Sequence, residues 1–232
     1  MADGGILSMT DVTFRWPGRP GFALTVPAFA MAKGDAVMIV GDSGSGKSTL
    51  LSLICGTLRA ASGSLHVAGT DLGRLSAAER DRFRADRIGV IFQQFNLLPY
   101  GSVRDNILLP LVFSPKRRGR ATDVDAEVLR LCTAMGLEPE VIGMSAGRLS
   151  VGQQQRVAVA RALIGQPELV VADEPTSALD QRAQTGFLDL LFEQMQVAGS
   201  SLLLVSHDTR LGRRFDRVER IEEIALTERK AA

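Results

Sequence analysis

Residues 41–49 have the types and spacing of a loop that binds phosphate. They read Gly-Asp-Ser-Gly-Ser-Gly-Lys-Ser-Thr and match the pattern G-x-x-x-x-G-K-[ST]. Glycines let a backbone wrap around a phosphate and aim several N–H groups at it. Lys47 can reach the β- and γ-phosphates of a nucleotide, and the Ser48 hydroxyl can bind Mg²⁺. The predicted nucleotide-binding residues of this loop are Gly41, Asp42, Ser43, Gly44, Ser45, Gly46, Lys47, Ser48 and Thr49.

The segments on either side of this loop must position it. Residues 36–40 form a short apolar run, which is typical of a buried strand, and residues 50–55 are predicted as a helix that ends near Gly56. The start of that helix would bring the positive end of its dipole to the same phosphate. Strand, glycine-rich turn and helix together favour a nucleotide site over a chance glycine-rich turn.

Two acids follow another apolar run, residues 169–172, farther along the chain. We expect Asp173 to lie beside Mg²⁺, and Glu174 to orient and deprotonate the water that attacks the γ-phosphate. By itself this pattern is equally typical of a helix cap or of loop charges. The phosphate loop upstream favours the catalytic interpretation.

Residues 149–156, Leu-Ser-Val-Gly-Gln-Gln-Gln-Arg, resemble the signature motif of ABC-type ATPases, whose common form is L-S-G-G-Q. The resemblance implies that Ser150, Gly152 and Gln153 open a helix that faces the γ-phosphate held by a second copy. A positive helix end suits that role. The alternative is an ordinary serine-capped helix. One departure from the family pattern is Val151, whose β-branched side chain narrows the freedom of the backbone.

Two loop residues resemble other conserved parts of this family's site. Gln93 follows an apolar strand and resembles the Q-loop glutamine, which contacts Mg²⁺ and the hydrolytic water; Gln94 is the alternative. His207 also follows an apolar strand and resembles the switch histidine that contacts the γ-phosphate. The resemblance thus implies the catalytic residues Lys47, Gln93, Glu174 and His207, with Ser48, Gln93 and Asp173 as metal ligands.

Two weaker matches complete the set. Residues 177–180, Ser-Ala-Leu-Asp, resemble the D-loop that crosses the dimer interface, which makes Asp180 a nucleotide-site residue. Trp16 stands where the family places an aromatic ring that stacks on adenine. The alternative for Trp16 is a residue that only covers the sheet.

The resemblance covers residues 7–207 and implies the fold. It predicts an α/β fold of the P-loop NTPase class, with a RecA-like core, an antiparallel β-subdomain and a helical subdomain. Residues 1–232 are expected to form one ATP-binding domain. Residues 1–94 and 161–232 would hold the core and the β-subdomain, and residues 95–160 the helical subdomain.

Local patterns refine this prediction. Ser102 can cap a helix through Phe113, which Pro110 should kink or end early. Residues 116–120, Lys-Arg-Arg-Gly-Arg, are predicted as a solvated basic loop, and residues 76–87 as a helix with a solvated face of mixed charge. After His207 we expect only a short charged tail.

Composition bounds the remaining possibilities. The chain has 232 residues and a formal net charge of +1, which gives no signal for direct nucleic-acid binding. No run reaches 18 apolar residues, and the first residues lack the pattern of a signal peptide. The two cysteines, Cys55 and Cys132, lie in apolar helical patterns and are predicted as reduced core thiols. A cytoplasmic location is expected.

Within the family, residues 88–99 resemble the ATPase subunits of the lipoprotein-releasing and macrolide-export group. This resemblance implies a homodimer, with ATP and Mg²⁺ at its interface, that serves integral-membrane permease subunits of the FtsX/MacB type. It would sit peripherally on the cytoplasmic face of the inner membrane. A short C-terminal tail fits this group and argues against the sugar-importer ATPases.

Four residues after the predicted Q-loop glutamine are candidates for docking the permease: Phe95, Leu97, Leu98 and Tyr100. Packing in the core is an equally good interpretation of them. One alternative function is a regulatory ATPase of a membrane complex that drives no transport, as in cell division. Another is an ABC ATPase of DNA repair or translation, which the lack of a second cassette, a coiled-coil insertion or zinc-binding cysteines disfavours.

Overall fold

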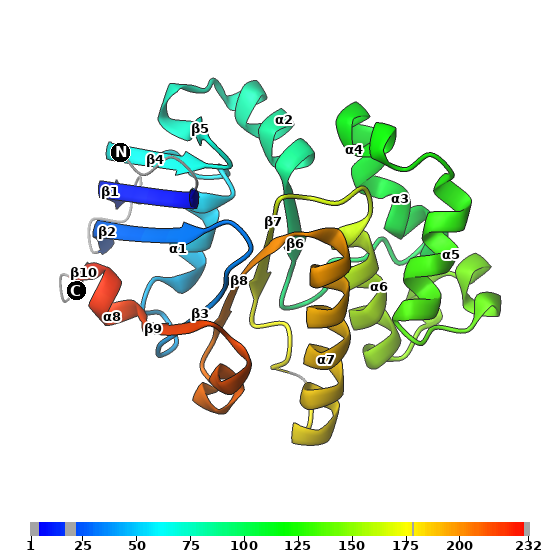
Figure 1. The fold of residues 1–232 in the computed structure, drawn as a ribbon. Coiled ribbons are helices and arrows are strands. Elements are labelled where there is room, and N and C mark those ends of the chain that lie inside the picture. Colours follow the sequence, from blue (N-terminus) through cyan, green and yellow to red (C-terminus); the bar gives the residue numbers. More distant parts are fainter. Residues whose placement is uncertain (1–4, 17–21, 178, 230–232) are drawn as a thin grey trace. The chain divides into compact units, whose positions relative to one another are not determined.

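The computed structural model describes residues 5–16, 22–177 and 179–229, and it mixes strands with helices (Figure 1). Outside this part lie residues 17–21, Pro-Gly-Arg-Pro-Gly, whose composition predicts a turn, and one residue of the predicted D-loop, Ala178. The chain divides into two compact units, residues 1–84 with 201–232, and residues 85–200. The predicted helical subdomain, residues 95–160, falls within the second unit, and its own bounds remain a prediction.

An antiparallel sheet of strand order β10-β2-β1-β4-β5 forms one layer of the first unit, as the sequence predicts for the β-subdomain (Figure 1). Its strands are β1 (Gly5–Arg15), β2 (Phe22–Ala32), β4 (Ser62–Val67), β5 (Thr70–Asp71) and β10 (Leu226–Arg229). Alternate side chains of β1 are buried, among them Leu7, Met9 and Phe14. This period of two places one face of the strand on the core.

Three parallel strands of order β8-β3-β9 form the other layer of this unit. They are β3 (Ala36–Val40), β8 (Ser201–Ser206) and β9 (Arg217–Arg220). Helix α1 (Lys47–Ile54) follows β3, and α8 (Ile221–Ile224) follows β9. The buried runs of β3 and β8 are the strands that the sequence predicts.

The prediction of a mere charged tail after His207 is wrong. That segment supplies β9, which pairs with β3, and β10, which pairs with β2. Strand β9 escapes sequence analysis because Arg217, Val218 and Arg220 are exposed, so it lacks the apolar run of a buried strand. The polar segment after His207 therefore contributes one strand to each of the two sheets.

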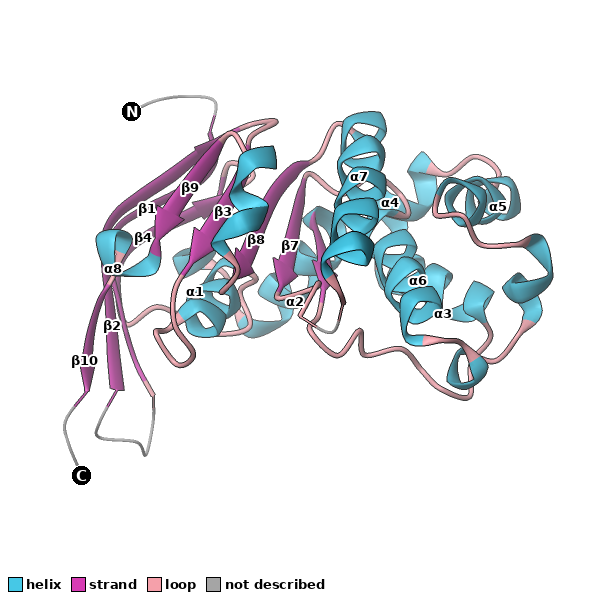
Figure 2. Cartoon of the chain, turned by 90° about the horizontal axis from the view of Figure 1, so that it is seen from below, coloured by secondary structure: helices cyan, strands magenta, loops and turns pink. Residues whose placement is uncertain are grey.

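Helices dominate the second unit, which also contains one pair of parallel strands (Figure 2). Its strands are β6 (Ile88–Ile91) and β7 (Leu169–Asp173), and its long helices are α3 (Val103–Phe113), α5 (Val124–Ala134), α6 (Val151–Leu163) and α7 (Gln181–Ala198). Ser102 caps α3 as predicted, in a capping box with Asp105. Pro110 lies inside α3 and does not end it early, since the helix continues to Phe113.

The predicted solvated basic loop is instead a short helix, α4 (Pro115–Arg120). Ser114 caps it and Pro115 takes its first turn, a pair typical of a helix start. Arg117 is 1% exposed, so the expectation that this basic run is solvated fails at its centre. Helix α2 (Ala77–Arg87) carries the mixed charges predicted for it. Asp86 is an exception to the predicted solvation of these charges, because its side chain is buried.

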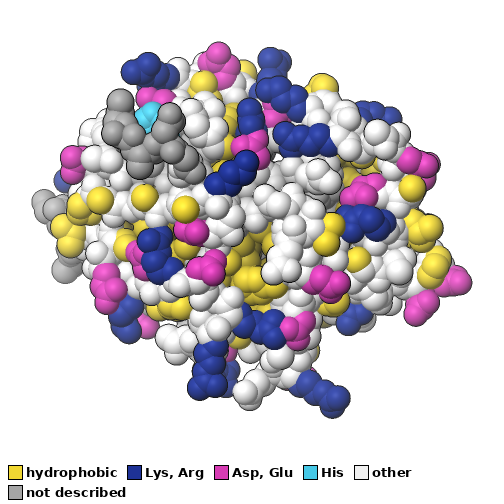
Figure 3. Space-filling model, viewed as in Figure 1, with side chains coloured by type: hydrophobic (Ala, Val, Ile, Leu, Met, Phe, Trp, Pro, Cys, Tyr) yellow, Lys and Arg dark blue, Asp and Glu magenta, His cyan; other side chains and the backbone are white. Residues whose placement is uncertain are grey.

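Both cysteines are buried and neither forms a disulfide within the described residues, as predicted. Burial raises the pKa of the Cys132 thiol to about 11. On the face drawn in Figure 3, Lys and Arg side chains alternate with Asp and Glu, which fits a net charge near zero. Within the described residues, every helix is too short or too polar to span a membrane.

Candidate functional site

The predicted phosphate loop lies between β3 and α1 in the first unit. Gly44 has a φ of 76° and Gly46 a φ of 105°, a left-handed region that favours glycine. A Cβ atom on Gly46 would also lie 3.2 Å from the Leu24 side chain. Gly46 is the N-cap of α1, and no side chain caps that helix end. Within the described residues, the N-cap of α1 therefore offers no side-chain acceptor, and this helix end remains suited to bind an anion.

Two side chains of the loop supply polar groups in a buried setting. Lys47 is 5% exposed, and its ammonium group donates hydrogen bonds to the carbonyl oxygens of Gly41, at 2.7 Å, and Asp42, at 2.9 Å. The Ser45 hydroxyl is buried and has no hydrogen-bond partner within the described residues. A buried hydroxyl without a partner costs free energy. The phosphate groups of ATP would satisfy it, so the loop fits the nucleotide.

His207 lies at the same edge of the sheet as the phosphate loop. It directly follows β8, whose last residue, Ser206, pairs with Val40 at the end of β3. The next residue, Asp208, binds the Arg210 side chain through both carboxylate oxygens, at 2.8 and 2.6 Å. These hydrogen bonds hold the pKa of Asp208 below its usual value and fix the turn after exposed His207.

Trp16 follows β1 on the side of the first unit that carries the phosphate loop. The preceding residue, Arg15, pairs with Ala23 of β2. The two residues that flank Ala23, Phe22 and Leu24, have the side chains nearest to Gly46 of the phosphate loop. The Trp16 ring is 37% exposed and meets Phe14 edge-on, with centroids 5.3 Å apart. It therefore covers part of the sheet and still offers surface to a ligand, which leaves both interpretations of Trp16 open.

In the second unit, Gln93 lies just beyond the end of β6, and Asp173 is the last residue of the neighbouring strand β7. The last pair of the β6–β7 ladder joins Ile91 to Ala172. Gln93 lies two residues after Ile91, and Asp173 directly follows Ala172. Both Gln93 and the alternative, Gln94, are exposed. The carboxyl ends of parallel strands thus bring an amide and a carboxylate to one edge, where ligands bind in open α/β sheets.

Glu174 has an unusual backbone conformation for its residue type. Its φ is 43°, in the left-handed region that non-glycine residues rarely adopt. Such conformations persist where the surrounding structure enforces them, often at active sites. Here Gln155 of α6 donates a hydrogen bond to the carbonyl oxygen of Pro175, at 2.7 Å, and Gln184 of α7 donates one to that of Thr176. Buried amides on two helices therefore hold the turn that follows Glu174.

The signature segment forms the start of α6 as predicted. Ser150 is the N-cap, and its hydroxyl and the Gln153 side chain form a reciprocal capping box. Val151 points outward and is 53% exposed. A Cβ atom on Gly152 would meet nothing within 4 Å, so the surface above this residue is open. Asp180 caps α7 in a similar way, through the Ala183 N–H.

Sequence reasoning missed Arg161, which holds the segment after Gln93. Arg161 lies on α6, is 6% exposed and donates hydrogen bonds to the carbonyl oxygens of Phe95 and Asn96. Both of these residues have positive φ, 58° and 47°. A basic residue within an otherwise apolar helical run was the available signal. Arg161 thereby joins the segment after Gln93 to the helix that begins with the signature motif.

The four predicted docking residues differ in exposure, and Leu97 is half-buried. Phe95 is buried, so core packing is the correct interpretation there. Leu98 and Tyr100 are exposed, by 48% and 97%. These two remain candidates for contact with a partner.

Within the described residues, no three His, Cys, Asp or Glu side chains converge as a metal site. The predicted ligands of Mg²⁺ are of another kind: a hydroxyl from Ser48, an amide from Gln93 and a carboxylate from Asp173. Oxygen ligands of this type, completed by phosphates and water, suit Mg²⁺. Ser48 belongs to the first unit, and Gln93 and Asp173 belong to the second, so the shared site stays a prediction.

Comparison with known families identifies the chain. A family model described as ABC transporter matches residues 24–177, more than half of the sequence. The chain belongs to the ABC transporter family. The match includes the phosphate loop, the signature segment and the strand that ends in Asp173.

Curated relatives of this ABC protein belong to the group that the sequence suggests. The lipoprotein-releasing system ATP-binding protein LolD of Legionella pneumophila is 36% identical over 198 residues, which cover 85% of both chains. The macrolide export ATP-binding/permease protein MacB of Rhodopirellula baltica is 35% identical over 212 residues. That alignment covers 91% of this chain and 30% of MacB.

Solved structures confirm the predicted fold class of this ABC protein. A dimeric post-hydrolysis state of the ATP-binding cassette MJ0796, bound to ADP and Pi, superimposes with a TM-score of 0.75 at 30% identity and covers 97% of this chain and 99% of that one. A second dimeric structure of MJ0796, a bacterial ABC transporter cassette, gives a TM-score of 0.78 at 29% identity with the same coverage. The fold is that of a P-loop NTPase.

Proposed function

We propose that this ABC protein binds and hydrolyses ATP with Mg²⁺ and thereby energises an integral-membrane permease of the FtsX/MacB type. The work done would be export of a substrate or its extraction from the inner membrane. The observation that carries the proposal is the phosphate loop, with Gly44 and Gly46 in left-handed conformations, Lys47 buried and the Ser45 hydroxyl without a partner. The printed names of LolD and MacB support the transport role.

The loop residues would act on the phosphates of ATP. Backbone N–H groups around Gly44 and Gly46 would surround the β-phosphate, and the open end of α1 would add its dipole. The Lys47 ammonium group would exchange its carbonyl acceptors for β- and γ-phosphate oxygens. Trp16 would stack on the adenine. Mg²⁺, held by Ser48, Gln93 and Asp173, would neutralise charge on the phosphates.

Residues at the strand ends would carry out hydrolysis. Glu174 would accept a proton from the attacking water and hold that water in line with the γ-phosphate. The rare backbone conformation of Glu174, and the amides that hold the turn after it, support this role. Gln93 would orient the same water, and His207 would donate a hydrogen bond to the γ-phosphate. Charge that develops in the transition state would meet donors that are already in place.

A second copy of the chain would complete each site. Each chain carries one phosphate loop and one signature segment, and the solved structures of MJ0796 are described as dimeric. The open surface above Gly152 leaves room for a partner's nucleotide, with Ser150 and Gln153 at the positive end of α6. Asp180 would lie at the same interface. We therefore propose a homodimer with ATP bound between its subunits.

The permease would bind outside this interface, at the exposed side chains of Leu98 and Tyr100. Arg161 of α6 is hydrogen-bonded to the backbone of Asn96, close in sequence to Leu98. A movement of this segment on permease binding would therefore be passed through α6 to the signature segment at the start of that helix. This arrangement implies a peripheral location at the cytoplasmic face of the inner membrane.

A pair of variants tests the proposed reaction. Glu174→Gln should lower ATP turnover by roughly 10²–10⁴-fold, the usual contribution of a positioned base. Glu140→Gln removes an exposed glutamate from a short 3₁₀ helix of the same unit, Pro139–Gly143, and serves as the matched control. Phosphate release with and without Mg²⁺ is the measurement. Turnover of Glu174→Gln close to that of Glu140→Gln would exclude Glu174 as the base.

A further inference from the structure

The corner between α3 and α4, residues 112–120, combines apolar and basic side chains on its surface. Val112 is 73% and Phe113 64% exposed at the end of α3, opposite the buried face that includes Ile107 and Leu111. Lys116 and Arg118 are exposed on α4 immediately afterwards. Val112 and Phe113 are adjacent, and contiguous exposed apolar surface commonly marks a contact site.

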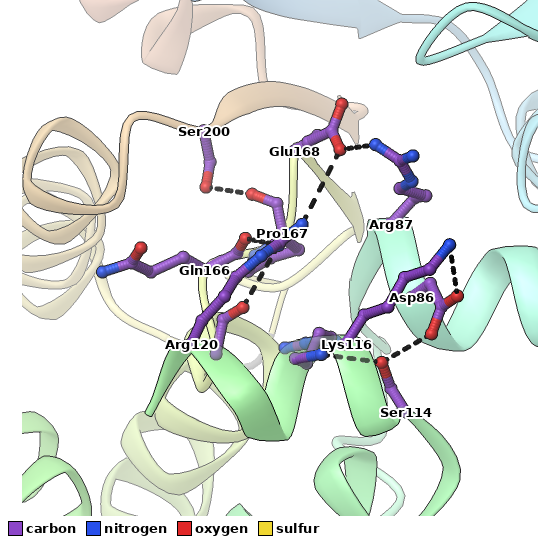
Figure 4. A network of polar contacts seen from close by, with 11 residues as sticks. Asp86, Arg87, Ser114, Lys116, Arg120, Gln166, Pro167, Glu168 and Ser200 are labelled. Atoms are coloured by element: carbon purple, nitrogen blue, oxygen red, sulfur yellow. Dashed lines mark hydrogen bonds and ion pairs between the residues drawn. The ribbon is translucent and has the colours of Figure 1, made fainter. Parts of the chain in front are cut away.

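This α3–α4 corner is firmly attached to the second unit. The buried Ser114 hydroxyl donates a hydrogen bond to Asp86, at 2.6 Å, at the end of α2 (Figure 4). Arg117 reaches the carbonyl oxygens of Ala162 and Ile164 at the end of α6, and that of Ile88 in β6. The corner is therefore a preformed surface, and its exposed side chains are presented by a fixed backbone.

Basic groups outnumber acidic ones around the corner. Lys116 lies 3.4 Å from Asp86, and Arg120 lies 3.9 Å from Glu168, which also pairs with Arg87 (Figure 4). Arg117 and Arg118 add two further positive charges, so five basic side chains face two carboxylates here. Within the described residues, Arg118 makes no ion pair.

The acids on the next helix are already engaged. Asp123 caps α5, Asp125 pairs with Arg104, and Glu127 pairs with Arg130. Asp125 and Glu127 reduce the positive potential of the corner little, because each is paired with an arginine. Asp123 accepts a hydrogen bond from the Ala126 N–H and keeps its charge, so it offsets one of the basic side chains.

We propose that the α3–α4 corner binds the anionic headgroup surface of a membrane. Phe113 and Val112 would enter the boundary between headgroups and acyl chains, while Lys116 and Arg118 would lie at the level of the lipid phosphates. Apolar side chains flanked by Lys and Arg are the composition of interfacial membrane contacts. The inference does not depend on ATP hydrolysis by this chain.

The same residues argue against other occupants. A nucleic acid would be attracted by the charge alone, and it would leave the apolar side chains without a contact. A second copy of this chain would bring another cluster of the same positive charge against the corner, which is unfavourable. An anionic lipid surface satisfies both the charge and the apolar pair.

Binding of the purified, full-length protein to lipid vesicles tests the proposal. Vesicles of phosphatidylcholine alone would be compared with vesicles that also contain phosphatidylglycerol, by co-sedimentation at low and high salt. The test variant is Phe113→Ser with Arg118→Gln. The control variant, Val197→Ser with Arg213→Gln, removes one exposed apolar and one exposed basic side chain elsewhere.

We expect the wild type to bind only the anionic vesicles, and less at high salt because counter-ions screen the attraction. Loss of one basic side chain near an anionic surface lowers partition by about fivefold, and loss of an inserted aromatic adds a comparable factor. The test variant should therefore bind at least tenfold more weakly than the control variant. No binding by the wild type, or equal binding by the two variants, would overturn the proposal. A change of oligomeric state in the test variant, measured without lipid, would instead assign the corner to self-association.

Discussion

The stability of the second unit should depend on a single buried side chain, Arg117. The perturbation that shows this is Arg117→Met, which keeps most of the apolar stem and removes the guanidinium group. In the structure this group donates to Ile164 through Nε, at 2.9 Å, and to Ala162 through Nη2, at 2.7 Å. Its contact with the carbonyl of Ile88 is longer, at 3.4 Å, and contributes less.

The magnitude follows from the two short hydrogen bonds. Each buried carbonyl that loses its donor costs about 1–3 kcal/mol. The variant also relieves the cost of burying a charge, a cost reflected in the pKa of Arg117, which burial lowers. The net loss should be about 2–4 kcal/mol in the free energy of unfolding. Arg117→Lys keeps the positive charge and loses the planar guanidinium group. Its free energy of unfolding should therefore lie between those of Arg117→Met and the wild type.

Urea denaturation at neutral pH measures this effect, with the midpoint and the slope fitted together. Arg118→Met is the matched control, because Arg118 is the next residue of α4 and is exposed. A surface substitution of this kind should change stability by less than about 0.5 kcal/mol. If Arg117→Met and Arg118→Met unfolded at the same urea concentration, the assignment of Arg117 as the anchor of α4 would be wrong.

Three further predictions concern single side chains. Lys47→Ala should weaken ATP binding by roughly 10–100-fold, because hydrogen bonds to charged groups contribute about 1.5–3 kcal/mol; titration at fixed Mg²⁺ measures this, and unchanged affinity in a folded variant would contradict it. Trp16, the only tryptophan, should change its fluorescence when ATP is added, and Trp16→Ala should weaken binding by roughly 1–3 kcal/mol if it stacks on adenine. A silent signal with full affinity would leave Trp16 as a sheet-covering residue. Cys132 should resist alkylation at neutral pH until the protein unfolds, since burial raises its thiol pKa to about 11; rapid modification of the native protein would show that the thiol is accessible.

The motifs could be predicted from sequence because they combine local chemistry with local structure. The phosphate loop requires glycine where φ is positive, and Gly44 and Gly46 have that conformation. Ser150 and Gln153 lie three residues apart, which is the spacing of a capping box, and they form one. Short-range rules of this kind need no knowledge of distant contacts.

Other features could not be predicted because distant contacts decide them. Arg117 is buried only because α6 ends and β6 begins beside α4, and a run of basic residues carries no sign of that. Strand β9 is formed by pairing with β3 although its side chains are polar. The positive φ angles of Phe95 and Asn96 likewise accompany hydrogen bonds from Arg161, far along the chain. Tertiary contacts override local preference at each of these places.

The central claim is that two copies of this chain share ATP between a phosphate loop and a signature segment. Sedimentation velocity of Glu174→Gln, with and without ATP, tests it most directly. The account predicts monomers without nucleotide and dimers with ATP, because slow hydrolysis preserves the bound state. Adding Gly152→Asp to the same chain should abolish the ATP-dependent dimer, because it places a negative charge where the partner's γ-phosphate would lie. Dimers that form equally well without ATP, or that persist with Gly152→Asp, would contradict the shared site.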